Sequence, residues 1–123
     1  MKGPKSLSSA ELEIMQVFWR EGKGMTAQEI LSKMPEKNWR IETLLTFLSR
    51  LSHKGTVSSV KVPVARRRPH SLFSAGISRL DYAKWQDQIH IDKYHDGDAE
   101  DLVKMLLDEG LITKECLLKI AAS

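Results

Sequence analysis

The chain of 123 residues has only one cysteine, Cys116, and no long apolar run. A single thiol excludes an intrachain disulfide framework and a metal cluster held by several thiolates, and it fits a reducing compartment. No segment approaches the ~20 consecutive apolar residues that a membrane-spanning helix needs, and residues 1 to 9 lack the apolar stretch of a signal peptide. We therefore expect a cytoplasmic protein without a membrane partner.

The sequence also lacks the motifs that carry common enzyme chemistry. It contains no GxSxG, HExxH, P-loop or CxxC pattern. The nearest candidate is the segment from His90 to Asp98, but helical spacing gives His90 and His95 no shared face, and a metal needs three or four converging ligands. We expect no catalytic residues, no metal and no cofactor, and a small hydrolase or metalloenzyme is a distant alternative.

The charge that is present divides unevenly along the chain. Residues 1–80 carry 14 basic and 6 acidic side chains, a net charge of +8, whereas residues 81–123 carry 5 and 10, a net charge of -5. A basic first part indicates a polyanionic partner, either nucleic acid or an anionic membrane, and the acidic second part indicates a different role. With 41% hydrophobic residues, the chain has enough apolar material to fold.

Helix starts are marked by one repeated device, a capping residue with an acidic residue three positions later. Ser8 with Glu11 predicts a helix from about Ser9 to Glu21, and Thr26 with Glu29 predicts a helix from about Ala27 to Met34. Later helices are expected to start after Ser78, Asp98 and Thr113. From Ser78 onward the pattern is purely helical.

The segment from about Trp39 to Lys54 predicts a two-faced helix. At roughly 100° per residue, one side is apolar and the opposite side is polar, so one face packs in a core and the other is free for recognition. Trp39 at its start fits equally a core aromatic or a contact to a nucleic-acid backbone. The apolar side is Ile41, Leu44, Leu45, Phe47, Leu48 and Leu51, and the polar side is Glu42, Thr43, Thr46, Ser49, Arg50 and His53.

A basic hairpin follows this helix. Strand-forming residues lie at about 56–62 and 71–74, and three arginines, Arg66, Arg67 and Arg68, lie between them. Pro63 and Pro69 cannot donate ladder hydrogen bonds, so we expect residues 63–69 to form the hairpin tip rather than strand. Three arginines at an exposed tip repel one another unless a polyanion is near.

Together these elements predict a mostly α fold with a small β-wing. Residues 1–77 are expected to form a winged helix-turn-helix DNA-binding domain, and residues 78–123 a C-terminal helical dimerisation arm. The arm has more apolar side chains than its short helices can cover, which indicates a second copy of the chain as partner. The expected dimerisation residues are Tyr82, Trp85, Ile89, Leu102, Met105, Leu106, Leu117 and Ile120.

Two segments resemble a known family, the penicillinase, methicillin-resistance and copper-responsive repressors (the BlaI/MecI/CopY family). The stretch from Leu7 to Met15, followed by Trp19, is similar to the AELEVM sequence and tryptophan of that family's first helix. The stretch from Thr43 to Leu51, followed by Lys54-Gly55, is similar to its TIQTMLLRL recognition helix. The resemblance covers roughly residues 7 to 120.

The resemblance implies a dimeric repressor that binds a palindromic operator and is released by a partner protease or a ligand. It also implies groove-reading roles for Thr43 and Thr46, an arginine near the helix end at Arg50, and a wing arginine close to Arg68. The sequence departs from the family pattern at Glu42, where a basic residue is commoner, and at Arg40-Ile41, which replaces a Ser-Pro start.

Two regulatory features of the family are not carried over. The pair aligned with the Asn-Phe cleavage site of the penicillinase repressors is Met105-Leu106. Copper-responsive members end in four cysteines, whereas this chain has only Cys116. The resemblance therefore names neither the inducing signal nor the sensor.

The predicted function is a dimeric transcriptional repressor of double-stranded DNA, and the alternative is a winged-helix adaptor that binds protein. The arginine cluster favours DNA, because an adaptor has no general need of it. In the DNA interpretation, basic side chains contact phosphates, helix residues meet base edges or flanking phosphates, and amides at the start of the helix capped by Thr26 can hold a phosphate. The candidate residues are Thr26, Arg40, Glu42, Thr43, Thr46, Arg50, Lys54, Lys61, Arg66, Arg67 and Arg68.

Overall fold

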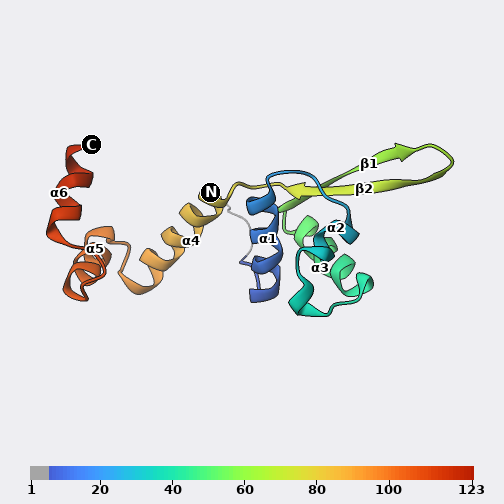
Figure 1. The fold of residues 1–123 in the computed structure, drawn as a ribbon. Coiled ribbons are helices and arrows are strands. Elements are labelled where there is room, and N and C mark those ends of the chain that lie inside the picture. The colour runs from blue at the N-terminus through green and yellow to red at the C-terminus, as the bar shows by residue number, and fades with distance from the viewer. Residues whose placement is uncertain (1–5) are drawn as a thin grey trace. The chain divides into compact units, whose positions relative to one another are not determined.

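The computed structural model describes residues 6–123, which form two compact units that meet at residues 83 and 84. The N-terminal unit contains α1 (Ser9–Glu21), α2 (Ala27–Ser32), a 3-10 turn η1 (Pro35–Lys37), α3 (Ile41–His53), β1 (Val57–Val64) and β2 (Arg67–Ala75). Helix α4 (Arg79–Tyr94) crosses the boundary, and α5 (Ala99–Asp108) and α6 (Lys114–Ala122) follow. Figure 1 shows this order along the ribbon. The expectation of a mostly helical winged-helix fold is confirmed.

Both predicted capping boxes are present. Ser8 Oγ accepts from Glu11 N at 3.2 Å, and Glu11 Oε1 accepts from Ser8 N at 2.8 Å. Thr26 and Glu29 make the same two bonds at 3.2 Å each. These bonds satisfy amides that a helix start leaves without intrahelical partners, so α1 and α2 begin where the sequence indicates.

Two helix boundaries differ from the sequence-based expectation. Helix α2 ends at Ser32 rather than Met34, and Pro35 then opens η1, because proline fits the first turn of a helix but not its interior. Helix α3 begins at Ile41 rather than Trp39, because Asn38 has a left-handed φ of 53° and Arg40 is extended. The extended Arg40 is the N-cap of α3.

The core lies among the first three helices and the base of the hairpin. Helix α1 buries Ile14, Met15 and Phe18, and the backbones of Met25 and Phe73 exchange hydrogen bonds of 2.9 and 2.8 Å that fasten the hairpin to the helices. The remaining buried apolar side chains of this cluster are Val17, Met25, Ile30, Met34, Leu44, Leu48, Leu51 and Val57. On α3, helical periodicity predicts that Leu45 lies in the core, but its side chain is 43% exposed, so that prediction is wrong.

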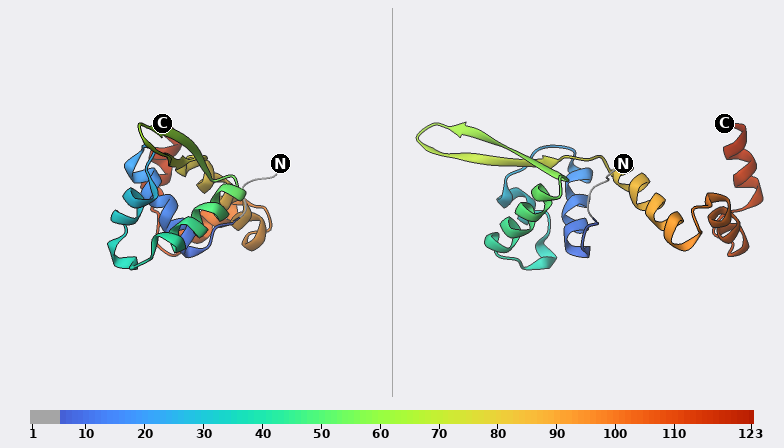
Figure 2. Two further views of the ribbon diagram at one scale, coloured as in Figure 1. Left: turned by 90° about the vertical axis from the view of Figure 1, so that its right-hand side faces the viewer. Right: turned by 180° about the vertical axis from the view of Figure 1, so that it is seen from behind.

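The hairpin, residues 57–75, is called the wing below; it extends away from the helices of its unit (Figures 1 and 2). Its strands run through both prolines, and the turn is only Ala65-Arg66, so the expected tip at residues 63–69 is wrong. Val62 pairs with His70 and Val64 with Arg67, so Pro63 of β1 lies opposite two residues of β2, Arg68 and Pro69, and the register shifts there. Prolines are tolerated because a bulge or an open strand edge requires no amide donor there.

The C-terminal unit, residues 84–123, is purely helical as expected. Asp98 Oδ1 accepts from Glu100 N at 3.0 Å, and Thr113 Oγ1 accepts from Cys116 N at 3.1 Å, so both predicted caps form. No side chain in residues 84–123 is fully buried. Among residues 6–123 no helix has the length and apolar character to cross a bilayer.

Candidate nucleic-acid interface

The polar side of α3 is exposed, as the sequence predicts. We call this set of six side chains the reading face: Glu42, Thr43, Thr46, Ser49, Arg50 and His53. Its opposite side is anchored by Leu44, Leu48 and Leu51, which are at most 1% exposed. A helix held in this way presents its polar side rigidly.

Two members of the reading face have defined contacts. The Thr46 hydroxyl donates to the carbonyl of Glu42 at 3.0 Å, which leaves its methyl group and oxygen lone pairs for a partner. The Arg50 guanidinium lies over the Phe47 ring, with its Cζ 5.8 Å from the ring centroid. Phe47 and Trp39 are half-buried, and their ring centroids are 5.1 Å apart.

A shallow groove of about 370 Å³ separates the start of α3 from the wing. Its lining includes Thr26, the N-cap of α2, Gln28 of α2, Leu45 of α3 and His70 of β2. The Thr26 hydroxyl already caps α2, so its remaining contribution is to lie beside the groove. Arg40, the N-cap of α3, is also exposed.

The basic residues of the wing are all exposed. Arg66 occupies the turn with a left-handed φ of 63°, Arg67 and Arg68 begin β2, and Lys61 lies on β1 opposite Ser71. None of these four takes part in an ion pair among residues 6–123. The wing thus concentrates positive charge that no acidic side chain of residues 6–123 pairs with.

Lys54 has a different environment. Its Nζ donates to Glu11 Oε1 at 2.7 Å and to the Ser6 carbonyl at 3.1 Å. Glu11 is only 3% exposed, and burial raises its pKa, but the hydrogen bonds from Lys54 and Ser8 outweigh this and lower the pKa below 4.5. Lys54 ties the end of α3 to the start of α1, a pairing that sequence reasoning missed because the partners lie 43 positions apart.

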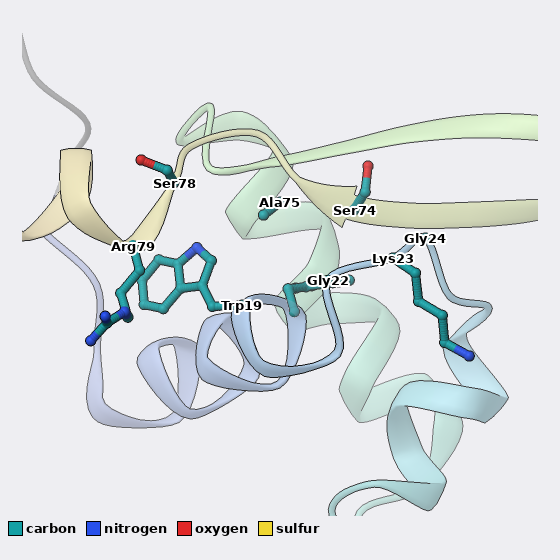
Figure 3. A pocket seen from close by; sticks show the side chains of 9 residues that line it. Trp19, Gly22, Lys23, Gly24, Ser74, Ala75, Ser78 and Arg79 are labelled. Atoms are coloured by element: carbon teal, nitrogen blue, oxygen red, sulfur yellow. The ribbon is translucent and has the colours of Figure 1, made fainter.

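A second groove, of about 490 Å³, lies at the end of α1 (Figure 3). In Figure 3 Arg79 lies beside the Trp19 indole, whereas Lys23 extends away from it. Trp19 Nε1 donates to the Ile77 carbonyl at 2.9 Å, and Ser78 Oγ accepts from Asp81 N at 3.0 Å. These polar groups bind within the chain, so we assign them a structural role.

The predicted dimerisation residues have two kinds of surroundings. Tyr82 is 7% exposed in the N-terminal unit, where its ring lies 5.9 Å from Trp19 and its hydroxyl accepts from Leu7 N at 3.3 Å. In the C-terminal unit the side chains are half-buried or exposed: Trp85, Leu102, Leu106 and Leu117 are half-buried, and Ile89, Met105 and Ile120 are exposed.

One histidine of the C-terminal unit, His95, forms a polar contact with an aspartate. His95 Nδ1 lies 2.8 Å from Asp101 Oδ2. The ring centroids of His90 and His95 are 5.4 Å apart, so the prediction that these histidines share no face is wrong: α4 ends at Tyr94, and His95 lies just beyond the helix. Among the described residues no three His, Cys, Asp or Glu side chains converge as metal ligands do.

Comparison with known proteins places these features in a family. A family model described as penicillinase repressor matches residues 7–123, nearly the whole chain. The chain belongs to the penicillinase repressor family. The predicted resemblance is thereby confirmed, as is the interpretation of the chain as a transcription regulator rather than an enzyme.

Individual relatives agree with the family assignment. The penicillinase repressor of Bacillus licheniformis is 24% identical over 115 residues, which cover 94% of this chain and 86% of the relative. The solution structure of monomeric BlaI of Bacillus licheniformis in complex with the blaP half-operator is 29% identical, with a TM-score of 0.51. That match covers 67% of this chain and 94% of the BlaI chain in that structure, and it confirms the winged-helix fold.

Proposed function

We propose that this family member is a dimeric repressor that binds a palindromic operator in double-stranded DNA, with α3 in the major groove and the wing on the phosphate backbone. One observation carries the proposal: an exposed polar helix face lies next to a wing whose arginines have no acidic partner among residues 6–123. The half-operator complex of the related BlaI supports the same class of ligand.

On α3, Thr43, Thr46 and Arg50 are proposed to meet base edges. Because the Thr46 hydroxyl proton is engaged by the Glu42 carbonyl, its methyl group suits a thymine methyl, while Arg50 suits guanine. Glu42, near the start of the helix, suits a cytosine amino group. Arg40, directly before α3, and Thr26, at the groove beside it, are placed to meet a flanking phosphate.

The wing is proposed to supply affinity rather than sequence preference. Phosphate contacts fix the register of a protein on DNA without reading sequence, and each releases bound counterions. Arg66, Arg67, Arg68 and Lys61 suit this role because they are exposed and unpaired within the described chain. Lys54 is left out of the proposed interface because Glu11 already binds its ammonium group.

The C-terminal unit is proposed to form the dimer. This unit has no fully buried side chain, and the large apolar side chains of Leu111, Leu118 and Ile120 are each more than 60% exposed. A second copy would cover such surface and would place two α3 helices about 34 to 36 Å apart, or a multiple of that, as a palindrome requires. Tyr82 is left out of this surface because it packs inside the N-terminal unit.

Release is proposed to follow a signal in the cytoplasm, delivered by a ligand or a sensor protease. The Met105-Leu106 pair lies inside α5. A protease acting there would need this helix to unwind locally, because cleavage requires an extended backbone. The test incubates the chain with an extract of cells exposed to a candidate inducer. N-terminal sequencing of the resulting fragments would locate any cut at this pair.

The experiment that tests the DNA proposal measures affinity against salt. Replacing Arg66, Arg67 and Arg68 by alanine should flatten the slope of log affinity against log salt by up to about 3 per subunit, because three phosphate contacts are lost. The matched control is Arg20→Ala, which removes an exposed arginine of α1 outside the proposed interface. An unchanged slope in the triple variant would exclude the wing from the interface.

A further inference from the structure

We infer that Phe47 is a positioning residue that holds the Arg50 guanidinium flat against its ring and so presents the N–H edge of Arg50 to a guanine. This rests on the proposed function, in which the reading face of α3 meets bases. It adds to that proposal a residue that touches no DNA and still sets the base preference at one operator position.

Phe47 and Arg50 are neighbours on the same helix. Phe47 and Arg50 are three positions apart on α3, a spacing at which helix side chains are neighbours. The Arg50 Cζ lies 5.8 Å from the Phe47 ring centroid, within the range of a cation–π interaction. No carboxylate among residues 6–123 forms an ion pair with Arg50, so no acidic side chain in this part of the chain draws the guanidinium away from the ring.

The Phe47 ring is itself held in place. It packs against the buried core from a half-buried position, and the Trp39 ring lies 5.1 Å away, tilted by 35°. Lys37 Nζ lies 5.8 Å from the Trp39 ring and is paired with Glu13 of α1. The two rings therefore lie next to each other, with Lys37 of η1 beside Trp39 and Arg50 of α3 beside Phe47, and the Trp39 ring and the core hold the Phe47 ring in place.

The chemistry of guanidinium explains the use of such a stack. An aromatic ring binds the flat face of the group, and its five N–H donors point outward in the guanidinium plane. Guanine offers two acceptors, O6 and N7, that a guanidinium edge meets with two parallel bonds. A ring that fixes the plane thus favours the bidentate contact without competing for the donors.

The first test uses the free protein and needs no DNA. Protons held above an aromatic ring resonate upfield, so the Arg50 side-chain protons of the full chain should be shifted upfield in NMR spectra. Phe47→Met, which keeps the apolar volume, should remove the shift, and Phe47→Tyr, which keeps the ring, should retain it. Arg50 protons at random-coil positions in the unaltered protein would overturn the proposal.

The second test measures base preference. After an operator has been selected from random DNA, each base pair is varied against the unaltered protein, Phe47→Met, Phe47→Tyr and Arg50→Lys. We expect one guanine whose preference Arg50→Lys abolishes, Phe47→Met lowers about two- to fivefold and Phe47→Tyr retains. The salt dependence should not change, because no phosphate contact is removed.

The outcomes separate this inference from the proposed function. If Phe47→Met keeps the full guanine preference, or if no base pair depends on Arg50, the positioning role is wrong while repression through α3 and the wing stands. If neither the unaltered protein nor any variant selects a DNA sequence, the proposed function itself fails and this inference fails with it. Thermal melting of each variant checks that the changes in preference come from folded protein.

Discussion

The two units of this chain are built by the same local rules and differ in what their apolar side chains contact. In both units, Ser, Thr or Asp caps begin the helices, as at Ser8 and Thr113. The N-terminal unit encloses a continuous cluster of fully buried side chains, whereas residues 84–123 enclose none. Good caps and amphipathic spacing therefore do not by themselves give a core.

The comparison indicates why one unit suits recognition and the other assembly. Fully buried Leu48 fixes one side of α3, so its opposite side can hold polar groups in set positions. Exposed apolar residues such as Leu111 and Leu118 gain most of their stabilisation only when another surface covers them. Charge follows the same division, since residues 1–80 are basic and residues 81–123 are acidic.

Removing residues 84–123 should produce the largest effect. The remaining chain keeps the Trp19–Tyr82 contact and the core, so we expect it to fold as a monomer that binds a half-site. Loss of bivalent binding should weaken affinity for a full operator by about 10² to 10⁴-fold. Sedimentation equilibrium and binding titration measure both effects; a truncated chain that stays dimeric with full affinity would show that residues 84–123 do not form the dimer.

Matched leucine truncations should separate the two units by concentration dependence. Leu48→Ala, in the buried core of the N-terminal unit, should cost about 2 to 5 kcal/mol of unfolding free energy at any protein concentration. For Leu106→Ala, the loss of unfolding free energy should become larger as the protein is diluted, because the stability of the C-terminal unit is linked to association of two chains. Urea unfolding at two concentrations checks this, and identical behaviour of both variants would contradict it.

A smaller effect is expected from Glu11, which joins α1 to the end of α3. Its pKa is lowered in the folded state, so its stabilising contribution is present above pH 4.5 and is lost as the pH falls through the lowered value. Glu11→Gln should therefore be about 1 to 3 kcal/mol less stable than the unaltered chain at pH 7, with the gap narrowing in acid. Urea unfolding at pH 7 and pH 3 measures this gap.

Glu13 provides the control for that measurement. It lies on the same helix and pairs with Lys37, but its side chain is 41% exposed. Glu13→Gln should change stability by no more than about 1 kcal/mol. If the Glu11→Gln gap is equally large at both pH values, the Lys54 pairing does not stabilise Glu11 in its charged form.

Sequence patterns predicted the parts of the fold that depend on near neighbours. The capping boxes at Ser8 and Thr26, which begin α1 and α2, follow from residues three positions apart in the sequence. The polar side of α3 also follows from helical spacing alone. Its identification as a candidate site needed only the adjoining arginines.

Features that depend on distant contacts were not predictable in this way. Leu45 has the helical spacing of a core residue, but it lines the groove between α3 and the wing. The α3 sequence alone does not show where the wing lies, so this exposure could not be predicted. Tyr82 matches the apolar pattern of the C-terminal helices, but Trp19, 63 positions earlier, covers it. Phe47 and Arg50 are three positions apart, so their proximity could be predicted from the sequence. The Trp39 ring beside Phe47, which holds it in place, is seen only in the structure.

Selection of bound sequences from a random DNA pool tests the central claim most directly, because it reads recognition and assembly together. We predict that the full chain enriches two inverted copies of one motif at a fixed spacing of about one duplex turn or a multiple of it. The chain ending at Ala83 should enrich a single copy of the same motif. Enrichment of a single copy by the full chain, or of no motif at all, would contradict the division into a reading unit and a dimerising unit.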